Sequence, residues 1–420
     1  MSLTIRPTLR PVVWSNIDSH GKMKRREPST SSDEEDYYDS PSRKRRKPLT
    51  QPMVYYPPQL TPSEKLWRDR CAFLYQRGYQ LRPRYQPHWS PAVMGNGRHH
   101  HSGEDHIMQI VPQVLDAIRR QDGLVVCVKM ISEVRKVHHI KITEFFSTRR
   151  MTSDTRNHVV PFYDCFADTY SPNIQFMVMP VLRRFDDPEF VVVSEVVDFI
   201  SQALEGLVFL HENHVAHNNL IADHIMMDAK SIIPTGWHFV SHFCEPDGMT
   251  RVKPLERRNH PVRYYFVGFG NSCSFPPGKQ PLVNHLGAED EEVPELLSRK
   301  PYDPYKLDIY TLGNVFKRQL FQKYYSLDFI QDLLKYMHIE DFAQRPAADS
   351  ILQAWYRIRS ALDEDDLENT RLTKKEEAKK LFSSRLSTDK PSPSGSSRST
   401  HSSNAGTRSD KRDISSILNN

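Results

Sequence analysis

Residues 217–228 are the most informative segment of this chain for its fold. They read His217-Asn218-Asn219-Leu220-Ile221-Ala222-Asp223-His224-Ile225-Met226-Met227-Asp228. Just upstream, apolar residues recur at helical spacing at Val196, Ile200, Leu204, Leu207 and Leu210. This spacing predicts a buried amphipathic helix over residues 195–213. The quoted stretch therefore begins where a buried helix ends.

The region upstream of this helix has the pattern of strands. Residues 114–118 and 124–129 predict two strands joined by a turn at 121–123, and residues 176–179 predict a short buried strand that stops at Pro180. Downstream, residues 307–320 and 327–337 have the pattern of helices. Strands followed mostly by helices predict an α+β protein with two lobes.

Both ends of the chain differ in composition from its middle. Hydrophobic residues make up only 38% of the 420 residues, which is low for a compact chain. Residues 1–60 contain basic clusters at 22–26 and 43–47, and residues 361–420 are rich in Ser, Arg and Lys. Such segments contain too few apolar residues to form a core. We therefore predict disordered tails at 1–60 and 361–420 around a folded domain at 61–360, with an N-lobe over 61–181 and a C-lobe over 182–360.

Composition also limits the classes of function. The chain has no apolar run of about 18 residues and no signal-peptide pattern at its start, so we expect a soluble intracellular protein without a membrane segment. The five cysteines show no CxxC spacing, which argues against a disulfide framework or a zinc knuckle. A net charge of +5 does not indicate nucleic-acid binding, except through the basic tails. The two basic clusters match a bipartite nuclear-localisation pattern, which predicts the nucleus, with the cytoplasm as the alternative.

Several motifs occur in an order that resembles a eukaryotic protein kinase from about residue 112 to residue 356. The quoted stretch resembles the catalytic loop H-R-D-L-x-x-x-N, and residues 266–270 stand where D-F-G is expected. The other matching segments are 126–129 (V-A-I-K), 178–180 (entry to the hinge), 293–295 (A-P-E), 308–313 (start of the central helix) and 344–346 (a late arginine). Segments at 60–85, 157–161, 185–188 and 261–266 resemble the kinase-like proteins that are expanded in mushroom-forming fungi. The resemblance implies a bilobal kinase fold.

The resemblance also implies roles for individual residues. Lys129 would contact the nucleotide phosphates and pair with Glu144, while Met179 and Val181 of the hinge would contact ATP. His217 opens the catalytic loop, and Asp308 would accept hydrogen bonds from the backbone near it. Glu295 and Arg345 would form a buried ion pair.

Three positions that carry chemistry in this family contain other residues here. Asn219 stands at the position of the catalytic base, and an amide has no useful basicity. His224 and Gly268 stand at the two magnesium-ligand positions, but Mg²⁺ prefers oxygen ligands and glycine has no side chain. No glycine-rich hairpin precedes Lys129; Gly95-Asn96-Gly97 lies further upstream. We therefore expect ATP binding to be weak and magnesium binding to be unlikely.

These observations lead to three hypotheses about function. The first is a pseudokinase that regulates or scaffolds protein partners in signalling. The second is an active kinase that uses ATP with displaced catalytic groups, for example Asp223. The third is a nuclear binding protein that acts through its charged tails. An insertion at about 231–262 could cover the cleft, form a docking surface or be a neutral loop, and the oligomeric state stays open.

Overall fold

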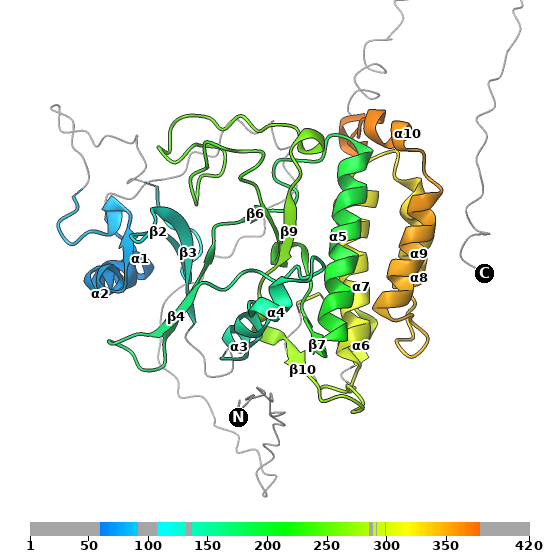
Figure 1. Ribbon diagram of the computed structural model, residues 1–420, viewed down its shortest axis with the longest axis horizontal. Coiled ribbons are helices and arrows are strands. Elements are labelled where there is room, and N and C mark those ends of the chain that lie inside the picture. The colour runs from blue at the N-terminus through cyan, green and yellow to red at the C-terminus, as the bar shows by residue number, and fades with distance from the viewer. Residues whose placement is uncertain are drawn as a thin grey trace, which may run out of the picture. The chain divides into compact units, whose positions relative to one another are not determined.

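A computed structural model of the protein describes residues 59–90, 107–131, 137–284, 289–290, 292–298 and 300–378. The basic clusters, the glycines Gly95 and Gly97 and the tail after residue 378 lie outside these ranges. The disorder predicted for the two ends therefore stays a prediction for those residues. Within the described ranges, the part before residue 181 combines a β-sheet with short helices, and helices dominate after it, which confirms the predicted α+β class (Figure 1).

A five-stranded antiparallel sheet forms the N-lobe, with the strand order β1-β2-β3-β5-β4. Its strands are β1 (Tyr79–Leu81), β2 (Val114–Arg119), β3 (Leu124–Ile131), β4 (Asp164–Ala167) and β5 (Gln175–Pro180). The predicted pair β2 and β3 forms a hairpin in which Val114 faces Lys129 and Arg119 faces Leu124. Gly123 adopts φ +72° in the turn, a conformation that favours glycine. Residues 82–113 connect β1 to β2, so a long segment replaces a short glycine-rich turn.

The two faces of this sheet have different partners. Val126, Val128 and Phe176 alternate onto one face and form a core with Trp67. Trp67 belongs to α1 (Pro62–Asp69), which is followed by α2 (Cys71–Gln76) and the short turn η1 (Pro83–Tyr85). The opposite face presents Cys127, Met177 and Met179 to the main core. This alternation follows the two-residue period of a strand.

Short strands surround the stretch at 217–228. β7 (Val215–Ala216) precedes it and pairs with β10 (Cys273–Ser274). β8 (Ile225–Asp228) closes it and pairs with β6 (Arg183–Arg184) and β9 (Arg263–Phe266). The turns η4 (Ala222–His224), η5 (Arg257–Asn259) and η6 (Phe269–Asn271) lie in the connections. The loop is therefore fixed at both ends by backbone pairing.

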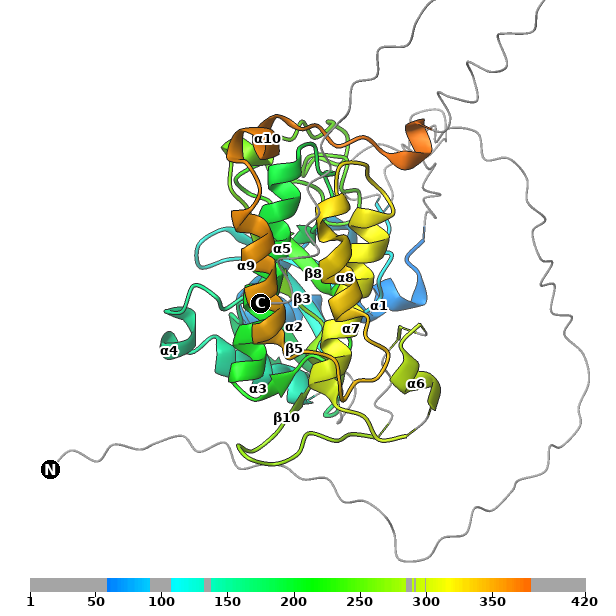
Figure 2. The same ribbon diagram turned by 90° about the vertical axis from the view of Figure 1, so that its right-hand side faces the viewer.

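Most of the C-lobe consists of helices. Two helices lie earlier in the chain, after β3: α3 (Val137–Phe146) and α4 (Arg149–Thr152). The predicted helix at 195–213 is α5 (Val193–Glu212), and it packs against α9 (Ala348–Ser360) (Figure 2). α7 (Pro304–Phe316) continues into a π-helical turn, η7 (Lys317–Phe321), and contacts α8 (Gln331–Met337), which follows η8 (Asp328–Ile330). α6 (Pro294–Ser298) is a short helix before α7.

The folded part extends beyond the expected boundary at residue 360. Residues 364–369 form α10 (Glu364–Asn369), which contacts α5 and buries Leu367. The backbone carbonyl of Thr370 accepts a hydrogen bond from the amide of Val193 at 3.0 Å. Residues 361–378, expected to belong to the C-terminal tail, are therefore docked mainly by backbone hydrogen bonds, which a polar composition does not reveal.

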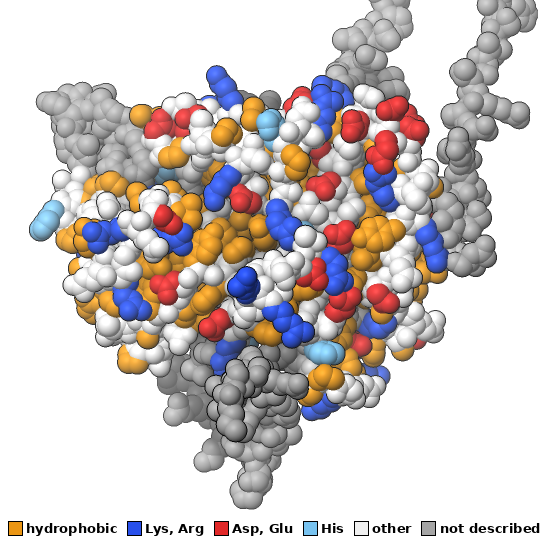
Figure 3. Space-filling model, in the orientation of Figure 1, with side chains coloured by type: hydrophobic (Ala, Val, Ile, Leu, Met, Phe, Trp, Pro, Cys, Tyr) orange, Lys and Arg blue, Asp and Glu red, His pale blue; other side chains and the backbone are white. Residues whose placement is uncertain are grey.

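Charged side chains of both signs lie on the described surface (Figure 3), in agreement with the small net charge of the chain. On the face shown in Figure 3, acidic and basic side chains are interspersed rather than separated by sign. None of the helices in the described ranges is both long enough and apolar enough to cross a membrane.

Candidate functional site

The stretch at 217–228 is anchored to the C-lobe by one buried carboxylate. Asp308 of α7 accepts hydrogen bonds from the backbone amides of His217 at 2.7 Å and Asn218 at 2.6 Å, as expected. Asn218 has a φ of +58°, a left-handed conformation that asparagine tolerates better than most residues. Its side chain accepts a hydrogen bond from the Tyr302 hydroxyl at 3.0 Å. The start of the loop is therefore held in one conformation.

His217 is fully buried, and its side chain contacts other parts of the protein. Its Nε2 donates to the carbonyl of Val267 at 2.9 Å, and its ring lies 4.8 Å from the ring of Phe269. Its Nδ1 has no hydrogen-bond partner among the described residues. Burial, together with the nearby His224, lowers the pKa of His217 to about 4. His217 is therefore a weak base, and its full burial makes it unsuited to act as a general base.

Asn219, at the expected base position, has its polar atoms occupied by the protein. It is 2% exposed. Its Oδ1 accepts the backbone amide of Glu289 at 3.2 Å, and its carbonyl accepts Nδ1 of His224 at 2.7 Å. Asp223, the candidate substitute, forms an ion pair with Arg184, and its side chain is 73% exposed. The geometry therefore brings no carboxylate to the base position from this loop.

The two expected magnesium positions fill each other's space. Gly268 has a φ of +86°. A Cβ atom at position 268 would lie 2.5 Å from Cδ2 and 2.7 Å from Nε2 of His224, well inside van der Waals contact. The imidazole of His224 thus occupies the volume that an aspartate at 268 would need. These residues do not fit Mg²⁺, which takes oxygen ligands. Among the described residues, no three His, Cys, Asp or Glu side chains gather in a way that could hold a metal ion.

Lys129 and Glu144 do not form the expected pair. Lys129 is half-buried on β3, opposite Val114 and Met177 in the two neighbouring strands. Glu144 is exposed on α3 and forms no ion pair with Lys129 in the part of the chain that the structure describes. The buried residues of α3 include His139, Ile140 and Thr143, and Glu144 lies about 40° beyond Ile140, at the edge of this buried face. The pairing of these two residues was therefore the wrong expectation.

The insertion at 231–262 reaches the N-lobe. Nε2 of its His238 lies 3.1 Å from Nη1 of Arg82, and Nε of Arg82 lies 2.9 Å from Oδ1 of Asp116. Asp116 sits on β2 directly opposite Cys127 of β3. Burial raises the pKa of the Asp116 carboxyl, while Arg82 opposes this shift. A buried arginine, Arg82, therefore links the insertion to Asp116 on β2, the strand next to the one that carries Lys129.

The insertion also packs beside the hinge. Arg183 of β6 donates to the carbonyl of His242 at 2.7 Å, and its guanidinium lies 5.8 Å from the ring centre of Trp237. Cys127, Met179 and Val181 are each 8% exposed and belong to the main apolar cluster of the domain. The side chains of the two hinge residues that were expected to contact ATP are therefore largely buried. Sequence reasoning left the role of the insertion open and did not identify Arg82, Asp116 or His238.

The expected ion pair between Glu295 and Arg345 is present. Oε1 of Glu295 and Nη1 of Arg345 are 2.5 Å apart, and both side chains are buried. A second anchor lies nearby, where Asp290 accepts Nδ2 of Asn314 at 2.8 Å and pairs with Arg318 at 2.8 Å. Sequence reasoning missed this anchor because Asp290 lies in a run of acidic residues that looks like solvated surface. Together the two anchors hold residues 289–290 and 292–298 to the C-lobe.

A comparison with protein families agrees with this architecture. The family model for the protein kinase domain matches residues 111–394, which is more than half of the chain. The expected bilobal, kinase-like α+β fold is confirmed by this match. The likeness to the fungal kinase-like group and the functional roles of individual site residues stay predictions. This chain belongs to the protein kinase family.

Proposed function

We propose that this protein is a pseudokinase, which regulates or scaffolds protein partners in signalling without transferring phosphate. The contact between His224 and Gly268 carries the proposal. An aspartate at position 268 would bring magnesium to the phosphates in an active kinase. Here the glycine has no ligand atom in its side chain, and the imidazole of His224 occupies the space beside it. The proposed loss of the metal site therefore involves two residues that pack against each other, rather than one altered residue.

The missing groups would cost most of the catalytic rate. A positioned general base contributes on the order of 10²–10⁴ in rate, or about 3–5 kcal/mol of barrier. Asn219 cannot supply it, because its Oδ1 already accepts the amide of Glu289. Loss of the metal would cost more, since phosphoryl transfer depends mainly on positioning and charge stabilisation.

The same contacts support a role that depends on shape. The Asn219–Glu289 hydrogen bond and the Asp290 anchor hold the segment around 289–290 against the C-lobe. In active kinases, this part of the chain changes conformation during activation. Here it is tied down by groups that need no nucleotide. A fixed surface of this kind suits recognition of a protein partner.

The residues around the nucleotide cleft support the part of the proposal that concerns weak ATP binding. Lys129 remains at its position on β3, but Glu144 does not pair with it and the side chains of the hinge residues are largely buried. The rival hypothesis of an active kinase needs a carboxylate near Asn219, and Asp223 is engaged by Arg184. This ion pair weighs against the rival.

A thermal-shift titration of the full chain with ATP tests the proposal. We expect little or no shift with ATP, and no dependence on magnesium. The Lys129→Ala variant should behave like the wild type, and ADP serves as a second nucleotide. A magnesium-dependent shift that Lys129→Ala abolishes, together with autophosphorylation, would establish the active-kinase alternative.

Two further features belong to the same proposal. The basic clusters at 22–26 and 43–47 support transport to the nucleus, with the cytoplasm as the alternative. Imaging of a fluorescent fusion with the basic residues of 43–47 changed to alanine would test this, and unchanged nuclear signal would argue against it. The motif likeness at 60–85 and 261–266 supports membership of the fungal kinase-like group.

A further inference from the structure

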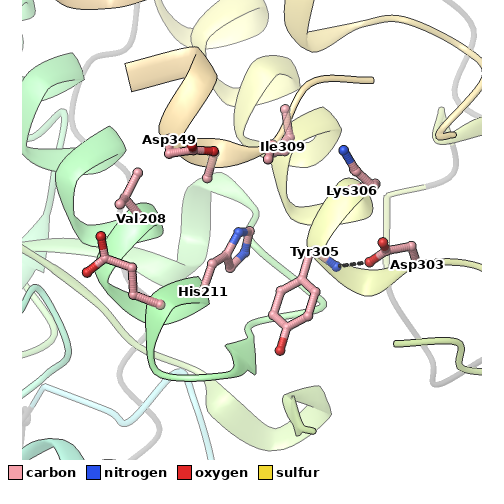
Figure 4. Close-up of a pocket in the computed structure, with 10 residues that line it drawn as sticks. Val208, His211, Asp303, Tyr305, Lys306, Ile309 and Asp349 are labelled. Carbon is pink, nitrogen blue, oxygen red and sulfur yellow. Dashed lines mark hydrogen bonds between the residues drawn. The ribbon is translucent and has the colours of Figure 1, made fainter. Parts of the chain in front are cut away.

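A pocket of about 310 Å³ opens on the C-lobe between α5, α7 and α9 (Figure 4). Its apolar lining includes Val208 of α5, Ile309 of α7 and Ala348 of α9, all three buried. The volume lies at the lower end of the range for ligand pockets, about 300–1,000 Å³. The residues that line it belong neither to the catalytic loop nor to the hinge, so the pocket is separate from the nucleotide cleft.

Acidic groups outnumber basic groups around this pocket. Carboxylates come from Glu212, Asp303 and Asp349, whereas Lys306 is the one lysine or arginine among the described residues that line it. The Lys306 ammonium is already engaged, because it donates a hydrogen bond to the carbonyl of Arg345. The pocket therefore disfavours anions and favours a positively charged ligand.

Two of these carboxylates already have partners in the protein. Glu212 pairs with Arg156 at 2.9 Å, and Asp303 accepts the backbone amide of Tyr305 at 2.9 Å. Asp349 lies in the first turn of α9 and is exposed. It forms no ion pair with any residue that the structure describes. Its carboxylate is thus the acidic group that is best placed to meet a ligand.

His211 offers a second acceptor. Its ring lies in the pocket between Val208 and Tyr305 (Figure 4). Its Nε2 lies 3.1 Å from Oδ2 of Asp308, and because a carboxylate can only accept, Nε2 is the donor. In the neutral ring, Nδ1 therefore keeps a lone pair, and it has no partner among the described residues. The Asp349 carboxylate and Nδ1 of His211 are thus two acceptors of the pocket, beside the Tyr305 hydroxyl, which can accept or donate.

We propose that this pocket binds a small organic cation, in which an ammonium group is attached to an apolar body. The ammonium group donates hydrogen bonds to the Asp349 carboxylate and to Nδ1 of His211. The apolar body covers Val208, Ile309 and Ala348. An ammonium group has three donors and no acceptor, which complements this set of acceptors.

Such a ligand would be coupled to Asp308, which anchors the catalytic loop, and to the ion pair between Glu295 and Arg345. His211 shares Asp308 with the amides of His217 and Asn218. On the other side, Arg345 donates to the carbonyl of Lys306 at 2.6 Å and pairs with Glu295. Occupation of the pocket would therefore stabilise the start of the catalytic loop. This inference goes beyond the proposed function, because it assigns a ligand class to a site outside the cleft.

Three matched compounds test the proposal on the full chain. The probes are 2-phenylethylammonium, the neutral 2-phenylethanol and the anionic 3-phenylpropanoate, which share an apolar body and differ in charge. We expect a saturable rise in Tm and measurable calorimetric binding with the ammonium compound only. Hydrogen exchange at the amides of His217 and Asn218 should slow when that compound binds. Equal binding of all three compounds, or no binding of the ammonium compound at millimolar concentration, overturns the proposal.

A pair of variants locates the site. Asp349→Asn should weaken binding of the ammonium compound by about two- to fivefold, the range expected when one exposed ion pair is lost. Asp349→Lys should weaken it by more than about tenfold, because attraction becomes repulsion. The control is Asp365→Asn, which removes an exposed carboxylate of α10 outside the pocket. If Asp349→Asn and Asp365→Asn bind the compound equally well, the pocket is not the site.

Discussion

Restoration of one metal position should damage the protein unless its neighbour is changed first. In Gly268→Asp, the new Cβ atom would lie 2.5 Å from Cδ2 of His224. The imidazole cannot move freely, because its Nδ1 donates to the carbonyl of Asn219 at 2.7 Å. We therefore expect Gly268→Asp to destabilise the wild-type protein strongly and the His224→Asn variant only mildly.

The size of the effect follows from two contributions. A side chain at φ +86° costs about 1–2 kcal/mol, because L-residues disfavour the left-handed region. Overpacking against the imidazole adds about 1–3 kcal/mol. Gly268→Asp alone should therefore lower the free energy of unfolding by about 2–5 kcal/mol. In the His224→Asn background the overpacking contribution disappears, so the coupling energy between the two changes is about 1–3 kcal/mol.

Urea denaturation of the wild type, both single variants and the double variant measures this coupling as a thermodynamic cycle. The control is Gly278→Asp, because Gly278 has a similar φ of +79° but has no atoms within 4 Å of a built Cβ. It should lose only about 1–2 kcal/mol. The reasoning is refuted if Gly268→Asp costs no more than Gly278→Asp, or if His224→Asn leaves the cost of Gly268→Asp unchanged.

Two other predictions concern stability. Burial holds the pKa of His217 at about 4, against 6.5 for an unperturbed histidine, so the unfolded chain takes up a proton first as the pH falls. Through this residue, the free energy of unfolding should therefore decrease by about 3 kcal/mol as the pH falls from 6.5 to 4, and no further below pH 4. Urea denaturation across that range should show a smaller decrease for His217→Gln than for the wild type. An equally large decrease in the variant would contradict the assignment. Glu295→Ala should cost about 3–5 kcal/mol, because it leaves the Arg345 charge buried without its partner. Lys335→Ala, which breaks an exposed pair with Asp332, should cost less than about 1 kcal/mol in the same assay, and a similar loss for both variants would show that burial is not the cause.

The order of residues alone was enough to predict the kinase family and to propose the loss of catalytic groups. The order of motifs from the strand at Lys129 to Arg345 predicted the bilobal fold, because each motif forms a local element whose pattern is visible in the chain. The residue types at 219, 224 and 268 predicted that a base and two metal ligands are missing, because chemical identity at a position is read without a structure. The anchor at Asp308 and the pair Glu295–Arg345 followed from the same motifs.

How these positions act on one another could be seen only in the folded chain. That His224 fills the space beside Gly268 depends on side-chain directions in two loops that are distant in sequence. The link from His238 to Arg82 depends on where a long insertion folds, which no periodicity encodes. Glu144 was misassigned because the face that α3 buries, which includes Ile140, Thr143 and Phe146, is set by packing against other elements. Local pattern specifies elements, whereas contacts between distant elements arise from packing of the whole domain.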